Sequence, residues 1–380
     1  MVQRLLPDPE SEALLSLARD LADGELRPLA NRHEADAEFP REVFRVLGKA
    51  GLLGLPYDEE WGGGGVSYEV YLQVIEELAA AWLSVAMGVS VHVLSCFPLA
   101  TAGSPQQRDA WLPDMLGGEL LGAYCLSEPQ SGSDAAGLAA TARRDGNTFV
   151  VNGTKAWITH GGEADFYNLF TREPGTFGAA GVTCLLATAD TPGLTAGPPE
   201  RKMGANGSTT AQIHLTDAVV PADRLVGAEG EGFAIAMSAL DSGRLGIAAC
   251  AVGLAQSALD LAVDYAGQRT QFGRPISQFQ GLGFLLADMA ARVQAGRALY
   301  LDAARRKDAG LPYSREAAIA KLVATDNAMA VATDAVQVLG GAGYTQDFPA
   351  ERYLREAKML QIVEGTNQVQ RLVISRSLTT

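Results

Sequence analysis

The hydrophobic pattern of the chain changes period twice, and the order of these changes limits the folds that it can adopt. Apolar residues recur at helical spacing as far as about Leu116, alternate in short strand-like runs up to Val226, and return to helical spacing from Gly232. Helices and strands that are segregated along a chain favour an α+β protein over an alternating α/β protein. We predict an N-terminal helical domain (1–118), a middle antiparallel β-barrel or sheet domain (119–228) and a C-terminal four-helix bundle domain (229–380).

The helical segments differ in how much of their surface is apolar. In SEALLSLARDLADGEL, Leu14, Leu17, Ala18 and Leu21 fall at i, i+3, i+4 and i+7, which predicts one buried face. Segments after Gly232, such as GRLGIAACAVGLAQSALDLAVDYA, are apolar over more than one stripe. Such helices usually form the centre of a bundle and often a subunit interface.

The middle segment carries turn signals between strand-like runs. TFVVNGTKAWIT places Asn152-Gly153 between two such runs, which predicts a β-hairpin at this dipeptide. In TAQIHLTDAVV, Ile213 and Leu215 alternate with polar residues, as in a strand with one buried face.

Charge and cysteine content exclude several classes of function. The 380 residues carry 30 Lys and Arg against 44 Asp and Glu, a formal net charge of −14, so we expect neither nucleic acid nor a membrane as partner. The N-terminus has no apolar signal region, and no run approaches the roughly 18 uninterrupted apolar residues of a membrane span. The four cysteines are scattered without metal-ligand spacing, so we predict no metal site and buried thiols in a reducing cytoplasm.

Four local segments combine polar residues and glycines, yet each alone has an ordinary structural explanation. YCLSEPQSGSD (124–134) could be a surface turn, and KAWITHGG (155–162) the end of a hairpin strand. RTQFGRPISQFQ (269–280) could cap a helix, and VLGGAGY (338–344) could end one.

A fifth segment, QIVEGTNQVQ, raises a sharper question about its acid. Glu364 stands between the apolar pair Ile362 and Val363 and a glycine. A carboxylate in this position either turns outward to water or is held in an apolar site, where desolvation makes it a stronger base. The local sequence does not decide between the two.

Taken together and in this order, the motifs are similar to those of one family. Over its whole length the chain resembles the acyl-CoA dehydrogenases, which are flavin-dependent enzymes. The resemblance rests on six motifs: YCLSEPQSGSD, KAWITHGG, LDSGRLGIA, RTQFGRPI with the following Gln280, QVLGGAGY and QIVEGTNQVQR.

The resemblance implies FAD bound between the β-domain and the C-terminal helices. A planar ring system needs an aromatic or aliphatic wall, and its heteroatoms need hydrogen-bond donors. Trp157 and Thr159 match the pair at the ring edge, with the threonine hydroxyl near the flavin N5, while Arg269 and Phe272 match residues that reach the FAD of a neighbouring subunit. The full set of matching cofactor positions is Tyr124, Leu126, Ser127, Gly132, Ser133, Trp157, Ile158, Thr159, Arg269, Phe272, Gln280, Gln337, Gly340, Gly341, Thr366 and Gln368.

For the substrate, the resemblance implies α,β-dehydrogenation of an acyl-CoA thioester to the trans-2-enoyl product. Glu364 would remove the α-proton as the catalytic base while the β-hydrogen passes as hydride to the flavin N5. The developing enolate needs donors, usually a flavin ribityl hydroxyl and a backbone N–H beside the base. The matching substrate positions are Ser133, Asp241, Arg244, Val363, Glu364 and Gly365.

Departures from the family pattern concern the base and the substrate. The isovaleryl type carries its base on the long helix, one residue before the arginine of LDSGR, and here that position is Gly243. Val363 replaces a tyrosine that is common in straight-chain members, which favours a short or branched acyl chain. His92 and Trp82 fall in the region that commonly closes the acyl pocket, but a core or surface role is favoured for each.

Alternatives of other classes remain open at this point. The same chemistry could act on an acyl or aminoacyl group attached to a carrier protein in a biosynthetic pathway. A flavin oxidase that uses O₂ is less favoured, because nitroalkane-oxidising relatives use aspartate as base. A non-catalytic scaffold would lack the base and flavin contacts. As partners, the resemblance implies an electron-transfer flavoprotein as acceptor and further copies of the chain, most often as a tetramer.

Overall fold

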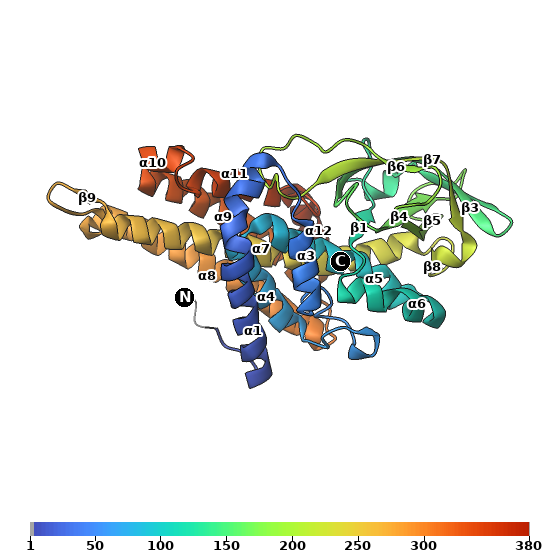
Figure 1. Ribbon diagram of the computed structural model, residues 1–380, viewed down its shortest axis with the longest axis horizontal. Coiled ribbons are helices and arrows are strands. Elements are labelled where there is room, and N and C mark those ends of the chain that lie inside the picture. Colours follow the sequence, from blue (N-terminus) through green and yellow to red (C-terminus); the bar gives the residue numbers. More distant parts are fainter. Residues whose placement is uncertain (1–3, 380) are drawn as a thin grey trace.

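The computed structural model describes residues 4–379 and places a β-sheet beside a large helical body (Figure 1). The predicted domain limits at residues 1 and 380 lie outside the described residues. The N-terminal helices are α1 (Pro9–Leu21), α2 (Arg27–Asp36), α3 (Arg41–Lys49), α4 (Tyr68–Ala81), α5 (Leu83–Ala102) and α6 (Pro105–Gly117). A π-helical turn, Ala22–Leu26, joins α1 to α2.

The first helix buries most of its predicted face. Asp8 caps α1 by accepting a hydrogen bond from the Ser11 backbone N–H at 2.7 Å. Ala18 is buried and Leu14 and Leu21 pack against the core, as predicted, whereas Leu17 is 40% exposed. The buried face is shifted toward Leu15, because α1 packs on α4 through the row that includes this residue.

The middle segment forms one mixed sheet in the order β6-β7-β3-β2-β4-β5-β8, with β1 paired to β4. Most neighbours are antiparallel, as predicted, but β1 and β2 pair with β4 in parallel. The strands are β1 (Gly122–Cys125), β2 (Thr141–Asp145), β3 (Thr148–Thr159), β4 (Phe166–Arg172), β5 (Val182–Thr188), β6 (Leu194–Ala196), β7 (Thr210–Pro221) and β8 (Leu225–Val226).

The hairpin prediction at Asn152-Gly153 was wrong. These residues lie inside β3, and the β2–β3 hairpin turns instead at Gly146, between Asp145 and Thr148. A register shift against β7 occurs at Asn152, whose side chain bonds both the backbone N–H and the carboxylate of Asp217. The extra residue of this bulge and its left-handed backbone lie on β7, at Asp217 with φ 48°, so the Asn-Gly dipeptide lies opposite a bulge instead of forming a turn.

The C-terminal helices form the predicted bundle. Its helices are α7 (Gly232–Gln268), α8 (Gln280–Asp308) and α9 (Ser314–Leu339), with α10 (Gly341–Tyr344), α11 (Ala350–Leu360) and α12 (Asn367–Thr379) packed around α9. A small hairpin, β9 (Thr270–Gln271) and β10 (Arg274–Pro275), joins α7 to α8 at the end of the molecule farthest from the sheet (Figure 1).

Two helices, α5 and α7, are long and apolar enough to cross a membrane by length and composition alone. Most of each apolar segment is buried inside the fold, against α4 and against each other among others. Burial of this kind is what the core helices of a globular protein require. Neither helix contains a run of 18 uninterrupted apolar residues, so the sequence alone did not predict either as a membrane span.

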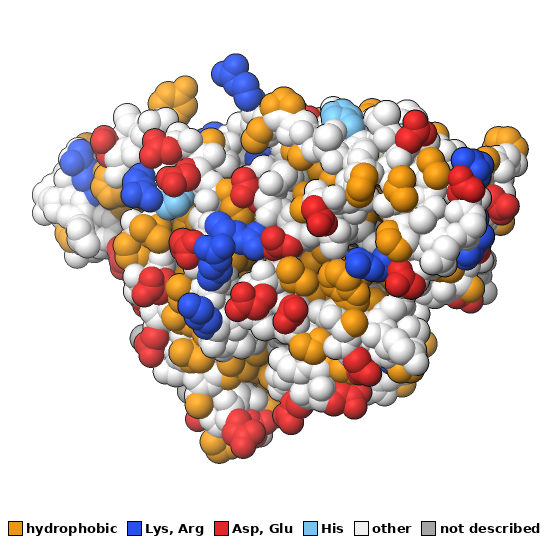
Figure 2. Space-filling view, turned by 45° about the vertical axis from the view of Figure 1, so that its right-hand side comes forward, with side chains coloured by type: hydrophobic (Ala, Val, Ile, Leu, Met, Phe, Trp, Pro, Cys, Tyr) orange, Lys and Arg blue, Asp and Glu red, His pale blue; other side chains and the backbone are white. Residues whose placement is uncertain are grey.

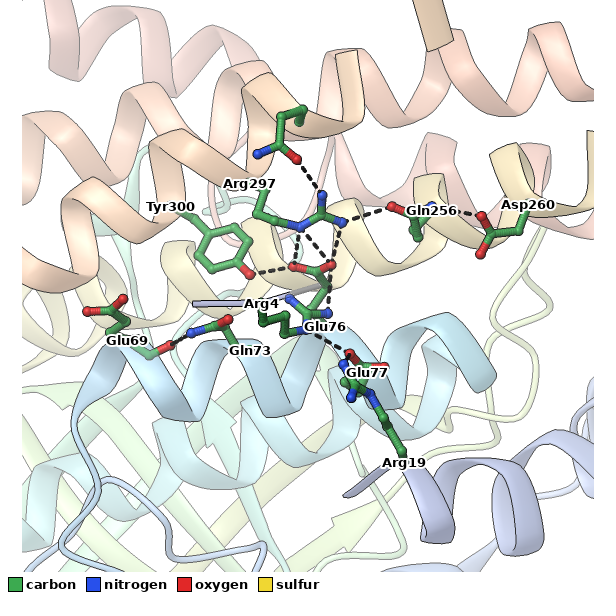
Figure 3. A network of polar contacts seen from close by, with 11 residues as sticks. Arg4, Arg19, Glu69, Gln73, Glu76, Glu77, Gln256, Asp260, Arg297 and Tyr300 are labelled. Atoms are coloured by element: carbon green, nitrogen blue, oxygen red, sulfur yellow. Dashed lines mark hydrogen bonds and ion pairs between the residues drawn. The ribbon is translucent and has the colours of Figure 1, made fainter. Parts of the chain in front are cut away.

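A buried ionic network joins the N-terminal helices to the bundle (Figure 3). Glu76 on α4 is 1% exposed and accepts hydrogen bonds from Arg4, from Arg297 on α8 at 2.7 Å, and from the Tyr300 hydroxyl. Burial opposes ionisation of Glu76, but the two arginines outweigh it and hold its pKa below the ordinary value. The network therefore fixes α4 against α8.

The distribution of surface charge and the state of the cysteines are as expected from the composition. On the face in Figure 2, acidic and basic side chains of the described residues are interspersed among apolar ones rather than gathered into a basic stripe. All four cysteines are buried and free, as predicted.

Candidate active site

Glu364 lies in a tight turn between α11 and α12. It adopts a left-handed backbone conformation with φ 50°, and Gly365 follows with φ 88°. Both carboxylate oxygens are buried, and neither has a hydrogen-bond partner among the described residues. Two consecutive left-handed residues direct the acid inward, so Glu364 is held in the protein rather than solvated.

Burial raises the pKa of Glu364 to about 7, and the nearby charges of Arg244 and Lys321 act in the opposite direction. The apolar environment does not come from the neighbour that the sequence favoured, because Ile362 is 54% exposed. Val363 is half-buried against the core. Buried groups of other elements face the acid instead: Tyr68 and Tyr71 of α4, Tyr124 of β1 and Cys250 of α7.

Gly243 on α7 leaves the space that the carboxylate occupies. A Cβ atom at this position would lie 2.0 Å from Glu364 Oε2. The acid of the turn and a side chain at position 243 therefore compete for one site, and Gly243 leaves that site to Glu364.

Gly243 also lines a cavity of about 200 Å³. Its walls come from the loop before α4, from α4 and α5, from the first turns of α7 and from Lys307 on α8. The lining residues are Pro56, Tyr57, Asp58, Trp61, Tyr68, Ser90, Val93, Leu94, Phe97, Ala100, Thr101, Ser242, Gly243 and Lys307. The cavity therefore places a space with both apolar and polar walls beside Gly243, the residue that the Glu364 carboxylate contacts.

Trp157 stands in a β-bulge near the end of β3. The register against β7 shifts between Lys155 and Ile158, and Trp157 has φ 62° with 64% of its side chain exposed. A bulge re-aims a side chain that regular pairing would place in the sheet. Ile158 is buried in the sheet core, so only its backbone can face a ligand, and Thr159 is half-buried.

The loop after β1 is fixed to β3 by a buried ion pair. Lys155 Nζ lies 2.7 Å from Glu128 Oε1, with side chains 0% and 2% exposed, and also donates to the Leu126 carbonyl at 3.2 Å. Glu128 accepts further bonds from the backbone N–H groups of Ala139 and Ala140. The Ala156 N–H donates to the Ser127 carbonyl at 2.9 Å, so Ser127 stays beside the Trp157 bulge.

The remaining predicted residues of this loop differ in accessibility. Tyr124 points into the protein, and its hydroxyl donates to the Ala236 carbonyl of α7 at 3.1 Å. Leu126 is buried, whereas Gly132 and Ser133 are exposed. The aromatic ring of Tyr124 therefore packs the sheet onto α7, and Ser133 is free to meet a ligand.

Asp241 and Arg244 form a pair at the start of the site. Arg244 is 6% exposed and donates to Asp241 Oδ1 at 2.5 Å, and Ser314 also donates to this oxygen. The positive charge of Arg244 lowers the pKa of Glu364, so Arg244 lies on the side of the pair toward this acid. Asp241 is the more exposed partner of the pair.

Six predicted cofactor residues lie at the opposite end of the bundle. On a straight helix, Arg269 is about 40 Å from Gly243 along α7. Phe272 is 93% exposed with φ 50° at the tip of the β9–β10 hairpin. The exposed residues at this end are Arg269, Phe272, Gln280, Gln337, Gly340 and Gly341.

In the turn after the base, Thr366 caps α12 by accepting from the Val369 N–H at 3.3 Å, and Gln368 is exposed. His92 and Trp82 do not line the cavity. His92 Nδ1 accepts from the Gly122 N–H while Nε2 lies 2.9 Å from the Met115 carbonyl, and Trp82 Nε1 donates to Glu34. Both are core residues.

Several residues around Glu364 were not predicted from the sequence as part of the site. Tyr68, Ser90 and Lys307 line the cavity, and Lys321 lies beside the Glu364 turn. No local pattern identified them, because they come from separate helices and meet only in the fold.

An exposed tryptophan in a bulge, two nearby hydroxyls and a desolvated carboxylate suit a planar redox cofactor and a proton transfer. The residues present thus fit a flavin, and the site is that of a flavoprotein dehydrogenase. Family models of the acyl-CoA dehydrogenase N-terminal, middle and C-terminal domains match residues 8–119, 123–218 and 230–379, respectively. The chain belongs to the acyl-CoA dehydrogenase family, whose members depend on FAD.

Relatives align over nearly the full length. The chain is 44% identical to an acyl-CoA dehydrogenase of Bacillus subtilis, covering 97% of this chain and 98% of the relative. It is 42% identical to the human mitochondrial short-chain specific acyl-CoA dehydrogenase, covering 97% and 90%. The structure of butyryl-CoA dehydrogenase from Megasphaera elsdenii has a TM-score of 0.97 at 39% identity, covering 100% of each chain.

Two further structures bear on partners. A chain in a structure titled for the electron transferring flavoprotein of Acidaminococcus fermentans has a TM-score of 0.97 at 40% identity and covers 99% of each chain. A prolyl acyl carrier protein oxidase has a TM-score of 0.94 at only 26% identity, covering 99% of this chain and 100% of the other.

Proposed function

We propose that the chain dehydrogenates short acyl-CoA thioesters at the α,β bond, with Glu364 as the base. The observation that carries this assignment is the buried, unpartnered carboxylate beside the cavity, with its pKa raised to about 7. A base with a pKa near the working pH combines strength with a large ionised fraction.

The chain contributes orientation and charge to the reaction. Glu364 takes the α-proton of the thioester, and we assign stabilisation of the enolate oxygen to a backbone N–H beside it. Trp157 supplies the wall of the flavin site, and the hydroxyls of Ser127 and Thr159 supply polar contacts to the ring. These three side chains would hold FAD, which would supply the acceptor for a hydride from the β-carbon. Asp241 and Ser133 flank the path of the CoA arm.

Two observations support a short acyl chain. The cavity of about 200 Å³ lies below the usual range of roughly 300–1,000 Å³ for ligand pockets. The human and Megasphaera relatives are named for short-chain and butyryl substrates. The activity on a carrier-bound acyl group is less supported, because the carrier-protein oxidase is a more distant relative at 26% identity.

The test is Glu364→Gln with a panel of acyl-CoA thioesters, assayed by bleaching of the flavin absorbance. The variant is expected to retain FAD and lose turnover, and the wild type to prefer chains of about four carbons. Bleaching of the variant at the wild-type rate would reject the base. A preference for acyl-carrier protein over acyl-CoA at equal concentration would favour the alternative.

The exposed far end of the bundle supports a homo-oligomer, which we propose to be a tetramer. Phe272, Phe284 and Tyr344 are 93%, 61% and 85% exposed near the predicted cofactor residues of this end. The β9–β10 hairpin and α10 lie at the opposite end of the molecule from the sheet that includes β3, the strand of Trp157 (Figure 1). A second copy would bring both groups to one FAD. Phe272→Asp should lower both the mass of the oligomer measured by sedimentation and the retention of FAD. If both stayed as in the wild type, the shared site would be contradicted.

We further propose an electron-transfer flavoprotein as acceptor and a cytoplasmic location. The Acidaminococcus structure supports the acceptor, and the free buried thiols suit a reducing compartment. Reoxidation of the reduced enzyme by O₂ as fast as by electron-transfer flavoprotein would contradict the first proposal.

A further inference from the structure

A buried lysine on α9 contacts the turn that carries the base. Lys321 is 0% exposed, and its ammonium donates to the Gly365 carbonyl at 2.9 Å and to Asn367 Oδ1 at 2.9 Å. Buried lysines are rare because desolvation of the ammonium is costly, so a structural purpose alone would be served more simply by a neutral donor. Lys321 belongs to none of the motifs that carry the family resemblance.

The turn needs such support. Glu364 and Gly365 both have left-handed backbones, and a non-glycine residue in this region is strained. A second, neutral donor reaches the same carbonyl, since Gln370 Nε2 of α12 lies 2.8 Å from the Gly365 oxygen. Asn367 is itself held by Thr325 and Asp326 of α9. The turn is therefore tied to α9 through Lys321 and Asn367, and to α12 through Gln370.

The charges around the acid are few and come from defined elements. Arg244 of α7 and Lys321 of α9 are the cations that favour the ionised acid, and Arg244 is already paired with Asp241. The titratable groups that face it from α4, β1 and α7 are Tyr68, Tyr71, Tyr124 and Cys250.

Lys321 is cationic at neutral pH. Burial lowers its pKa to about 8, while Glu364 and Asp326 oppose this effect and Arg244 adds to it. It can therefore act on the acid as a charge as well as a donor.

We propose that Lys321 is a positioning residue for Glu364, which holds the left-handed turn through the Gly365 carbonyl and supplies positive charge that keeps the buried carboxylate ionised. The inference rests on the proposed role of Glu364 as the base. It assigns to α9 a part of the site that lies outside the recognised motifs.

The matched pair of variants is Lys321→Met and Gln370→Met. Each removes one side-chain hydrogen bond to the Gly365 carbonyl, but only the first removes a charge. Both are prepared as FAD-loaded enzyme, with FAD content and thermal unfolding as checks of the fold. Lys321→Gln, which keeps a donor without the charge, replaces Lys321→Met if that variant does not retain FAD.

Two measurements separate the effect of the Lys321 charge on Glu364 from the effect of its hydrogen bonds on the turn. The first is the acid limb of kcat/KM against pH, with butyryl-CoA as probe, which reports the free enzyme. The second is the infrared carbonyl band of protonated Glu364 in substrate-free protein, identified as the band lost in Glu364→Gln and titrated with pH.

Loss of a nearby opposite charge raises the pKa of a carboxyl group, so both titrations should move up by about one pH unit in Lys321→Met. Gln370→Met should lower kcat without this shift, and Lys321→Arg should titrate like the wild type. Equal shifts in both methionine variants, or none in Lys321→Met, would overturn the inference. Full turnover by Glu364→Gln would instead reject the proposed function itself.

Discussion

Replacing the base should make the protein more stable at neutral and alkaline pH. In the folded protein the pKa of Glu364 is about 7, against an ordinary value of 4.5. A difference of this size between folded and unfolded states corresponds to roughly 3 kcal/mol of free energy that opposes folding once the acid is ionised. Glu364→Gln keeps the shape of the side chain and removes this term.

The sign follows from proton binding. Between pH 4.5 and about 7 the folded state holds the Glu364 proton while the unfolded state releases it, so wild-type stability falls with rising pH and levels off above 7. The glutamine variant lacks this slope. Its stability relative to wild type should rise by roughly 3 kcal/mol between pH 4.5 and 8 and then stay constant.

The assay is thermal and urea unfolding of both proteins from pH 4.5 to 9, at fixed protein and FAD concentrations because binding shifts apparent stability. The amide may itself lack a partner, so the change with pH decides the result rather than the absolute difference. Glu119→Gln, at an exposed position, is the control and should show no such change. A flat difference between Glu364→Gln and wild type would refute the burial of an ionisable base.

Three further results are expected. The kcat/KM for butyryl-CoA should rise with pH through about 7, as Glu364 of the free enzyme loses its proton, and a pH-independent value below 6 would contradict this. Glu76→Gln should cost about 3–5 kcal/mol in urea unfolding at pH 7, because Arg297 loses its buried partner, and this cost should vanish as the pH falls through the lowered pKa of Glu76. Lys155→Met should weaken FAD binding measured by flavin fluorescence, because it frees Glu128 and the loop beside Trp157, and unchanged affinity would dismiss this support role.

The order of the elements could be predicted because it depends on periodicity that is local in sequence, and the choice of Glu364 as candidate base rests on a local motif and stays a prediction. The alternation at Ile213 and Leu215 is buried as predicted, and the loop acid is held inward. The hairpin prediction at Asn152-Gly153 failed for a physical reason: pairing with β7 continues through the dipeptide, and the extra left-handed residue of the bulge is Asp217 of β7.

The environment of the base could not be predicted, because burial is a property of the assembled fold. The neighbour Ile362 is exposed, whereas the buried groups that interact electrostatically with Glu364 lie on α4, β1 and α7. Lys321 precedes Glu364 by 43 residues in the sequence. Nothing in its local sequence distinguishes a buried lysine from a solvated one on an Ala-rich helix.

Backbone strain links these separate parts of the site. Among the described residues, seven non-glycine positions have a left-handed φ, and three of them are Trp157, Phe272 and Glu364. Each such position is costly and persists only where surrounding structure determines it. The Trp157 bulge lies beside the Lys155–Glu128 pair, and the Glu364 turn is bonded by Lys321. Buried cations thus hold two strained segments, so substitutions at these lysines should affect the site before they affect the core.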